Sequence, residues 1–209
     1  MSPSWDDVRA ALAAREPAQV ADPPSPRAAV ALVLREGGQG LEVLFIRRAE
    51  HPQDPWSGQM AFPGGRAEPG DGDLRATAIR EAREEIGVDL SRAAEYLGAL
   101  DEVRAMARMR PMNLTITPFV FRLCEPFEPA LSDEVRSLHW VALPDLLDNA
   151  ARSTMEYAHQ GVALQFPCLR FEELVIWGLT YRMFMSFQER FGAPASLAPD
   201  GAPPSAAEA

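Results

Sequence analysis

The stretch from Leu74 to Val88 reads LRATAIREAREEIGV, and it constrains the fold of this 209-residue chain more than any other. Apolar residues recur at helical spacing, which predicts a helix over Leu74–Ile86 whose buried stripe is Ile79, Ala82 and Ile86. Three carboxylates at relative positions i, i+3 and i+4 share the other side: Glu81, Glu84 and Glu85. Asp71 or Asp73 can cap the N-terminus of this helix, and Gly87 suits the position just after its C-terminus.

Carboxylates grouped on one helix face repel one another, so the cluster favours a positive partner. A hard divalent cation fits, because Mg²⁺ takes oxygen ligands and keeps waters for substrate phosphates. The alternative is a solvated helix face whose charge Arg80 and Arg83 balance. The segment just upstream, Ala61–Gly65 (AFPGG), predicts a strand that ends in a tight glycine loop, where the backbone can approach a ligand closely. The two elements together favour the metal site.

From Gly65 through Val88 the sequence resembles the Nudix box, written G-x5-E-x7-R-E-U-x-E-E-x-G-U with U aliphatic. Residues 80–88 (REAREEIGV) match its second half. The first half departs, because the spacing from Gly65 to Arg80 is one residue longer and Asp71 is the best match for the expected Glu. The resemblance implies an α/β fold, a Nudix-type α/β/α sandwich with a mixed β-sheet.

The resemblance also assigns roles. It implies that Mg²⁺ or Mn²⁺ is bound by a set of four residues: Glu81, Glu84, Glu85 and, through its carbonyl, Gly64. Arg80 would hold the glutamates in place. The general base that activates water would be either Glu81 or Glu134, a residue outside the box in the segment LSDEV, which is otherwise an ordinary charged loop.

Coenzyme A pyrophosphatases carry an upstream motif, LLTxRSxxxRxxxGxxxFPGG, that this chain matches in part. Leu44–Ala49 (LFIRRA), Gly58 and Phe62–Gly65 fit, whereas Asp54 stands where the second Arg is expected and one residue is inserted. The similarity implies cleavage of coenzyme A or an acyl-coenzyme A to 3′,5′-ADP and phosphopantetheine. Two alternatives stay open: a house-cleaning hydrolase of nucleoside triphosphates, ADP-ribose or nucleotide sugars, and a Nudix-fold binding module without turnover.

Five arginines are candidates for binding the substrate: Arg47, Arg48, Arg104, Arg108 and Arg110. Strand alternation turns the first two to opposite sides, so one of them at most is expected to reach a ligand. The other three belong to the segment 103–113 (VRAMARMRPMN), whose methionines could line an adaptable pocket. The alternative for this segment is a surface loop.

The composition limits the classes of partner that this chain is expected to bind. The formal net charge is −10, so no chain-wide basic field exists for nucleic acid. The two cysteines, Cys124 and Cys168, form no CxxC pair and are expected to be free thiols in a reducing cytoplasm. With neither a signal segment nor an apolar run near the roughly 18 residues of a membrane span, we expect a cytoplasmic protein with a small nucleotide-derived substrate. It would be a monomer or a homodimer.

Three regions are predicted along the chain: an N-terminal helix and Pro-rich linker (1–26), the Nudix domain (27–191) and a disordered tail (192–209). Within the domain, apolar β-rich runs predict seven strands: Ala28–Leu34, Leu41–Ile46, Met60–Phe62, Tyr96–Leu100, Leu114–Phe121, Leu138–Val141 and Val162–Phe166. One or two helical turns are expected over Pro144–Asn149, and a long helix over Phe171–Phe191. The last helix carries an aromatic stripe with core packing as its expected role: Trp177, Tyr181, Phe184 and Phe187.

Overall fold

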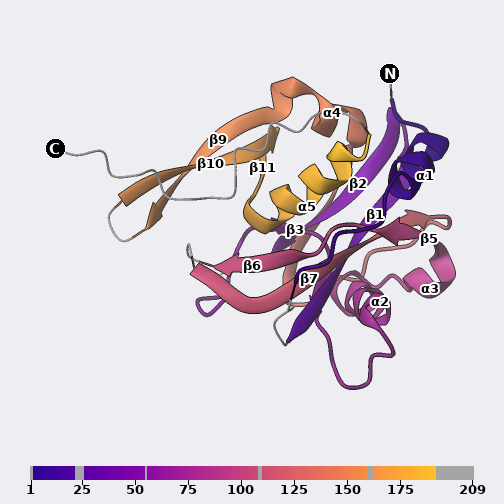
Figure 1. Ribbon diagram of the computed structural model, residues 1–209, viewed down its shortest axis with the longest axis horizontal. Coiled ribbons are helices and arrows are strands. Elements are labelled where there is room, and N and C mark those ends of the chain that lie inside the picture. The colour runs from indigo at the N-terminus through magenta and orange to yellow at the C-terminus, as the bar shows by residue number, and fades with distance from the viewer. Residues whose placement is uncertain (1, 22–25, 55, 108–109, 160–161, 192–209) are drawn as a thin grey trace.

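The computed structural model describes residues 2–21, 26–54, 56–107, 110–159 and 162–191, shown as coloured ribbon in Figure 1. The tail predicted over 192–209 and the predicted substrate residue Arg108 lie outside these ranges. In the described part of the chain, no helix is both long enough and apolar enough to cross a membrane.

The larger of two sheets contains eight strands: β1 (Arg27–Gly37), β2 (Gly40–Arg48), β3 (Met60–Ala61), β4 (Gly64–Arg66), β5 (Ala94–Ala99), β6 (Val103–Ala107), β7 (Arg110–Leu123) and β8 (Val135–Ala142). Its main path runs β3-β2-β1-β7-β5, while β4 also pairs with β1, β6 with β7 and β8 with β2. Strands β1 and β7 are parallel, and the other pairs are antiparallel, so the sheet is mixed as expected.

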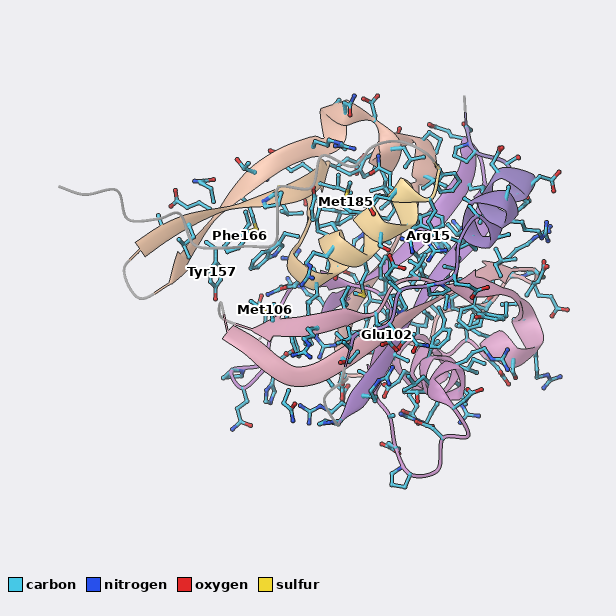
Figure 2. All side chains as sticks on the ribbon, in the orientation of Figure 1. Arg15, Glu102, Met106, Tyr157, Phe166 and Met185 are labelled. Atoms are coloured by element: carbon cyan, nitrogen blue, oxygen red, sulfur yellow. The ribbon has the colours of Figure 1, made fainter. Side chains whose placement is uncertain are left out.

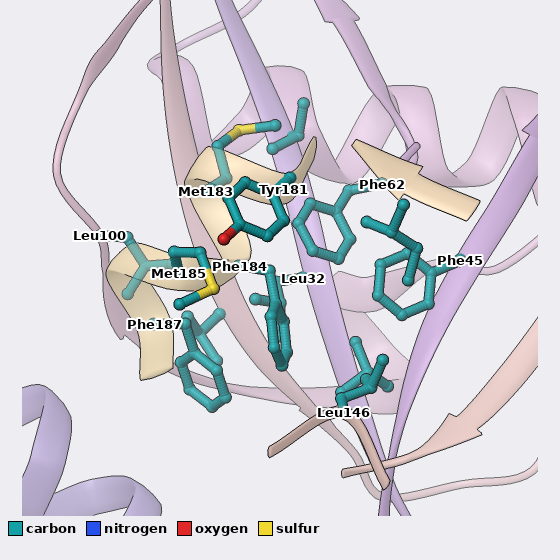
Figure 3. Packing of buried hydrophobic residues seen from close by; sticks show 14 of the residues in the cluster. Leu32, Phe45, Phe62, Leu100, Leu146, Tyr181, Met183, Phe184, Met185 and Phe187 are labelled. Atoms are coloured by element: carbon teal, nitrogen blue, oxygen red, sulfur yellow. The ribbon is translucent and has the colours of Figure 1, made fainter. Parts of the chain in front are cut away.

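Helices cover both faces of this sheet, which confirms the α/β/α sandwich. On one face, Ala29, Ala31 and Val33 of β1 pack against α2 (Leu74–Ile86) and α3 (Leu90–Ala93). On the other face, Val30, Leu32 and Leu34 join a core shared with α1 (Trp5–Ala13) and α5 (Gly178–Glu189). Figure 3 shows this second core, where Phe184 and Phe187 of α5 lie close to Leu32. Because both faces are covered, β1 reads as one continuous apolar run.

Helix α2 has the bounds that its sequence predicts, and both of its ends are capped. The Asp73 carboxylate accepts a hydrogen bond from the Ala76 N–H. At the other end Gly87 has a φ of 78°, a left-handed conformation that glycine adopts without strain, and its N–H donates to the Arg83 carbonyl.

The long helix predicted from Phe171 is wrong at its start. Residues 152–177 instead form a second, three-stranded antiparallel sheet of β9 (Arg152–His159), β10 (Val162–Phe171) and β11 (Leu174–Trp177). Helix α5 begins only at Gly178. The turn between β10 and β11 passes through Glu172, which has a φ of 50°. Pairing with β10 therefore overrides the helical pattern of residues 171–177.

The four residues of the predicted aromatic stripe therefore lie on two different elements. Tyr181, Phe184 and Phe187 are buried in the core, which confirms core packing for these three. Trp177 lies on β11 instead, with its ring centroid 5.3 Å from that of Tyr157 and 5.8 Å from that of Phe166, the two residues labelled on the second sheet in Figure 2. The surface loop considered for residues 103–113 is also wrong, since β6 and the start of β7 pair there.

A cluster of charges ties both ends of the described chain to the larger sheet. Asp101, in the turn between β5 and β6, pairs with Arg15 at 2.5 Å and with Arg190 at 3.2 Å. The Arg190 side chain is fully buried and also donates to the carbonyls of Leu12 and Arg15. Burial alone would raise the pKa of Asp101, but hydrogen bonds from Arg15 and the Ala18 N–H, with both arginine charges, lower it to about 2.

Two short elements follow β8 at the rim of the larger sheet: helix α4 (Leu143–Leu147) and a 3₁₀ turn, η1 (Asn149–Ala151). They correspond to the helical turns predicted over Pro144–Asn149. Leu143 and Leu146 are buried in the core that contains α5. These turns connect the larger sheet to β9, which Figure 1 shows running above α5 with its two partner strands.

Candidate active site

The acidic face of α2 meets the glycine turn at β4. Glu85 is only 4% exposed, and one oxygen of its carboxylate accepts a hydrogen bond from the Gly64 N–H at 2.9 Å. Burial raises the pKa of Glu85 to about 7 against the opposing effects of this hydrogen bond and of Arg48, and the charges of Glu81 and Glu134 act in the same direction as burial. A buried carboxylate is therefore held beside two others of the same charge.

Backbone contact requires a glycine at position 64, and at position 65 a side chain would displace the Glu81 carboxylate. A Cβ atom on Gly64 would lie 2.3 Å from the Ala29 carbonyl oxygen, and one on Gly65 would lie 2.4 Å from Oε1 of Glu81. Both separations are far inside van der Waals contact. The absence of side chains lets β4 lie against β1 on one side and against the Glu81 carboxylate on the other.

Arg80 joins the box to the loop that precedes it. Its guanidinium donates to Asp71 at 3.0 Å, to Glu84 at 2.8 Å and to the Arg66 carbonyl at 2.9 Å, and it lies 3.0 Å from Glu81. A planar fork with five donors can serve these four acceptors at once, whereas the ammonium group of a lysine has only three donors. Arg80 thus lies among the acidic groups and contacts both Glu81 and Glu84.

Asp71, the residue matched to the box's first Glu, has a structural role at this junction. Its carboxylate accepts from Arg80, from the Glu68 N–H and from the Thr77 hydroxyl. The hydrogen bond from Arg80 is the largest of the effects that hold the pKa of Asp71 well below its usual range. The loop before α2 is therefore fixed although its spacing departs from the motif.

A cavity of about 410 Å³ opens beside these groups, and its lining combines charged and apolar residues from different elements. The charged residues, which we call the acidic end, are Arg48, Asp54, Arg66, Glu68, Arg80, Glu81, Glu84 and Glu134. The apolar residues, which we call the floor, are Ala28 and Val30 of β1, Leu114 and Ile116 of β7, and Leu179 and Met183 of α5. An elongated ligand with an anionic part and a less polar part suits this shape.

Glu134 comes to the cavity from the loop before β8, as its predicted role requires. The loop is fixed by backbone hydrogen bonds from Ser132 N–H to the Glu85 carbonyl and from Ala49 N–H to the Glu134 carbonyl. Burial is the main cause that raises the pKa of Glu81, and the charges of Glu84 and Glu134 contribute, against the opposing effect of Arg80. Both candidate bases therefore line the same cavity.

Of the arginines predicted to bind substrate, Arg48 lines the cavity and Arg47 does not, in agreement with strand alternation. The Arg48 guanidinium is already engaged, 2.8 Å from Asp54 and 3.7 Å from Glu85. Arg104 is on β6 outside the cavity lining and donates to the Ala21 carbonyl. Arg110 begins β7, and its side chain is not among those described. The structure thus brings one of the five to the cavity.

Trp56 and Arg66 are among the lining residues that sequence reasoning missed. Trp56 lies in the segment where the coenzyme A motif departs, and its indole N–H donates to the Met106 carbonyl at 3.3 Å. Arg66 follows the glycine turn directly. Its proximity to Gly65 was the available signal, but the box leaves that position unspecified.

The fit of a divalent cation can be judged from the donor set. Among the described residues, no three His, Cys, Asp or Glu side chains stand together as a ready metal centre. Glu84 is 53% exposed and bound to Arg80, while Glu85 turns to Gly64. Even so, all the acidic groups of this end are oxygen donors, which hard cations prefer. Burial, with a contribution from the charges of neighbouring carboxylates, raises the pKa values of Glu81 and Glu85, and a cation would stabilise their charged forms. The chemistry therefore fits a cation, although the predicted ligands are not converged.

The fold and the cavity define a class: an α/β/α domain whose acidic site is formed by one helix and one glycine turn. Residues 24–160 match the NUDIX domain family, which is more than half of the chain, and the protein belongs to that family.

Relatives agree with this assignment. An uncharacterized protein of Schizosaccharomyces pombe is 41% identical over 111 residues, which cover 50% of this chain and 33% of that protein. The uncharacterized Nudix hydrolase NudL of Yersinia pestis is 31% identical over 144 residues, 66% of each chain. The matched part of the chain thus spans between a third and two thirds of these relatives' lengths.

Solved structures agree on the fold. A MutT/nudix family protein from Enterococcus faecalis aligns over 90% of this chain and 69% of its own, with a TM-score of 0.54 and 17% identity. The MutT protein from Methanosarcina mazei aligns over 83% and 96%, with a TM-score of 0.50 and 22% identity.

Proposed function

We propose that this protein is a divalent-metal-dependent hydrolase that cleaves the diphosphate bond of a small nucleotide-derived substrate. The observation that carries the proposal is the excess of acid at the charged end of the cavity, where five carboxylates face three arginines: Asp54, Glu68, Glu81, Glu84 and Glu134 against Arg48, Arg66 and Arg80. An anionic substrate needs a cation to enter such a site. The NUDIX assignment and the NudL relative support hydrolysis as the outcome.

The proposed roles follow the match to the Nudix box. Glu81, Glu84 and Glu85 would hold Mg²⁺ or Mn²⁺, with the Gly64 carbonyl as a further oxygen donor. The bound metal would neutralise the diphosphate and lower the pKa of a water molecule. Either Glu81 or Glu134 would take the proton of that water as general base, and Arg80 would keep the glutamates in place.

Coenzyme A or an acyl-coenzyme A is the proposed substrate within this class. The match of Leu44–Ala49, Gly58 and Phe62–Gly65 to the coenzyme A pyrophosphatase motif supports it. The apolar floor of the cavity supports it as well, because an acylated pantetheine arm can lie there while the diphosphate lies at the acidic end. The products would be 3′,5′-ADP and phosphopantetheine or its acyl form.

The test is product formation from a panel of diphosphates with Mg²⁺ and with Mn²⁺. The panel contains coenzyme A, an acyl-coenzyme A, NADH, ADP-ribose, a diadenosine polyphosphate and a nucleoside triphosphate. Preferential cleavage of the coenzyme A compounds is expected. Preference for another member would replace the proposed substrate by the house-cleaning alternative, and metal binding without any hydrolysis would favour a binding module.

A further inference from the structure

The three arginines that line the cavity are not equally available to a ligand. Arg80 is engaged by Asp71, Glu81 and Glu84. Arg48 lies between Asp54 and Glu85. Within the described part of the chain, Arg66 has neither an acidic partner nor a side-chain hydrogen bond, and its side chain is exposed. Of these three arginines, Arg66 is therefore the one whose guanidinium a ligand can bind without breaking an ion pair.

The sheet register directs Arg66 toward the cavity. In the antiparallel pair of β1 and β4, Arg66 is the partner of Ala28, and cross-strand partners project from the same face of a sheet. Ala28 lines the cavity floor, and its other neighbour, Ile116 on β7, does so too. The small methyl group of Ala28 leaves room above the strand for the long Arg66 side chain.

The backbone of Arg66 is fixed while its side chain is not. Its carbonyl accepts from Arg80 at 2.9 Å, and the next residue, Ala67, donates its N–H to the Arg27 carbonyl at 2.9 Å. One residue before it, Gly65 lies directly against the Glu81 carboxylate. Arg66 thus stands at the boundary between the acidic end and the apolar floor.

We propose that Arg66 is the anion-binding residue of this site and contacts the diphosphate of the substrate directly. This inference rests on the proposed function, since it takes a diphosphate as the ligand. A substrate whose diphosphate lies at the carboxylates and whose body lies over the floor must pass this boundary. The planar guanidinium suits the task because it can donate two hydrogen bonds to one phosphate group.

The first test is steady-state kinetics with the diphosphates that the wild-type protein cleaves. Arg66→Gln is expected to raise KM about tenfold with kcat within about twofold, because a contact made equally in ground and transition states affects KM alone. Arg66→Lys, which keeps the charge but not the fork, should be intermediate. The matched control is Arg83→Gln, an equal charge change at an exposed position of α2 outside the cavity. A KM for Arg66→Gln within twofold of the control value would overturn the proposal.

The second test separates this proposal from the proposed hydrolysis. Calorimetry with Mg²⁺ and α,β-methylene-ADP, whose P–C–P bridge cannot be hydrolysed, measures binding without turnover. Arg66→Gln should bind it about tenfold more weakly than the Arg83→Gln control, while both bind adenosine alike. If the wild-type protein cleaves no diphosphate and this pattern is still found, the anion-binding role of Arg66 is supported and the proposed hydrolysis is refuted. Equal affinity of the two variants for the analogue, or no binding by the wild-type protein at millimolar concentration, would refute the role of Arg66.

Discussion

Two clusters of ion pairs, one around Arg80 and one around Asp101, lie on opposite sides of the larger sheet and differ in their balance of charge. Around Arg80, one guanidinium serves three acids, Asp71, Glu81 and Glu84. Around Asp101 the ratio is reversed, because two guanidinium groups, those of Arg15 and Arg190, serve one carboxylate. Through Nη1, Arg190 also donates to the backbone carbonyls of Leu12 and Arg15. The first cluster is short of positive charge, whereas the second has enough.

This difference distinguishes the Arg80 cluster, which suits a ligand-binding site, from the Asp101 cluster, which stabilises the fold. Near Arg80, burial raises the pKa values of Glu81 and Glu85, and the charges of neighbouring carboxylates add to the rise, which destabilises the charged forms of these two groups. Asp71 differs, because its hydrogen bond from Arg80 lowers its pKa. At Asp101 the surroundings lower the pKa of the single carboxylate, which stabilises it. Folds keep unfavourable local electrostatics mainly where a function requires them. On this comparison, substitutions around Arg80 should affect turnover, and substitutions around Arg190 should affect stability.

The largest effect is expected from Glu85→Gln. Turnover should fall at least about a hundredfold, because the variant removes a proposed metal ligand from the buried end of the site. Thermal stability should be unchanged or slightly higher, since the amide still accepts from Gly64 and burying it incurs no charge penalty. The measurement is kcat with Mg²⁺ beside a melting curve, with Glu125→Gln as an exposed control. Near-normal turnover would mean that the carboxylates near Arg80 are not needed for catalysis, which contradicts the proposed difference between the two clusters.

Arg190→Met should give the opposite result. The variant loses the pairing with Asp101 and the donors to the carbonyls of Leu12 and Arg15, at a cost of about 3 kcal/mol. Urea unfolding measures this free energy, and kcat should stay at the wild-type value at temperatures well below the melting point. A fall in kcat with unchanged stability would mean that this cluster is also part of a site.

Acidification should weaken the Asp101 cluster in a defined range. The pKa of Asp101 is about 2 in the folded chain against 3.8 as its ordinary value, so the unfolded state binds the proton more readily and stability rises with pH. The contribution, roughly 2 kcal/mol, is complete above pH ~4 and disappears as the pH falls through ~2. The free energies of unfolding of wild type and Asp101→Asn should therefore differ more at pH 5 than at pH 2. A constant difference would contradict this account.

The smallest effect is expected from Thr180→Val in α5. Its buried hydroxyl donates to the Met60 carbonyl at 2.9 Å and ties the helix to β3 beside the cavity. Losing that hydrogen bond should cost about 1 kcal/mol, with a modest rise in KM because one edge of the cavity loosens. Unfolding and kinetic measurements on one preparation would check both. A stability loss above that of Arg190→Met would reverse the proposed ranking.

Sequence analysis was most successful where the deciding contacts are local. The bounds of α2 follow from Asp73, Gly87 and a clear period, all within the helix or next to it. Alternation also predicted that at most one of Arg47 and Arg48 would face the ligand side, but choosing between them requires the position of the next strand. Arg48 forms an ion pair with Asp54, a residue that the sequence comparison identified only as a departure from the coenzyme A pyrophosphatase motif.

Elements that depend on distant partners were missed. Residues 171–177 have the apolar content of a helix, yet β11 forms because β9 and β10 offer an edge to pair with. The turn at Glu172 carries neither glycine nor proline to mark it. The same limit explains the loop considered for residues 103–113, where Val103 pairs with Ile116 across a hairpin.

The parallel pairing of β1 with β7 also determines the order in which the cavity can form. Arg27 is the partner of Thr115, so the two halves of the apolar floor come from distant parts of the chain. Contacts of such separation form slowly, because a long loop must close before they contribute. During synthesis, a chain that ends before β7 already contains residues 80–88 of the acidic motif and yet has only the β1 half of the floor. Until β7 emerges, that edge of β1 is open to strands of other chains, which makes this interval the one most exposed to aggregation.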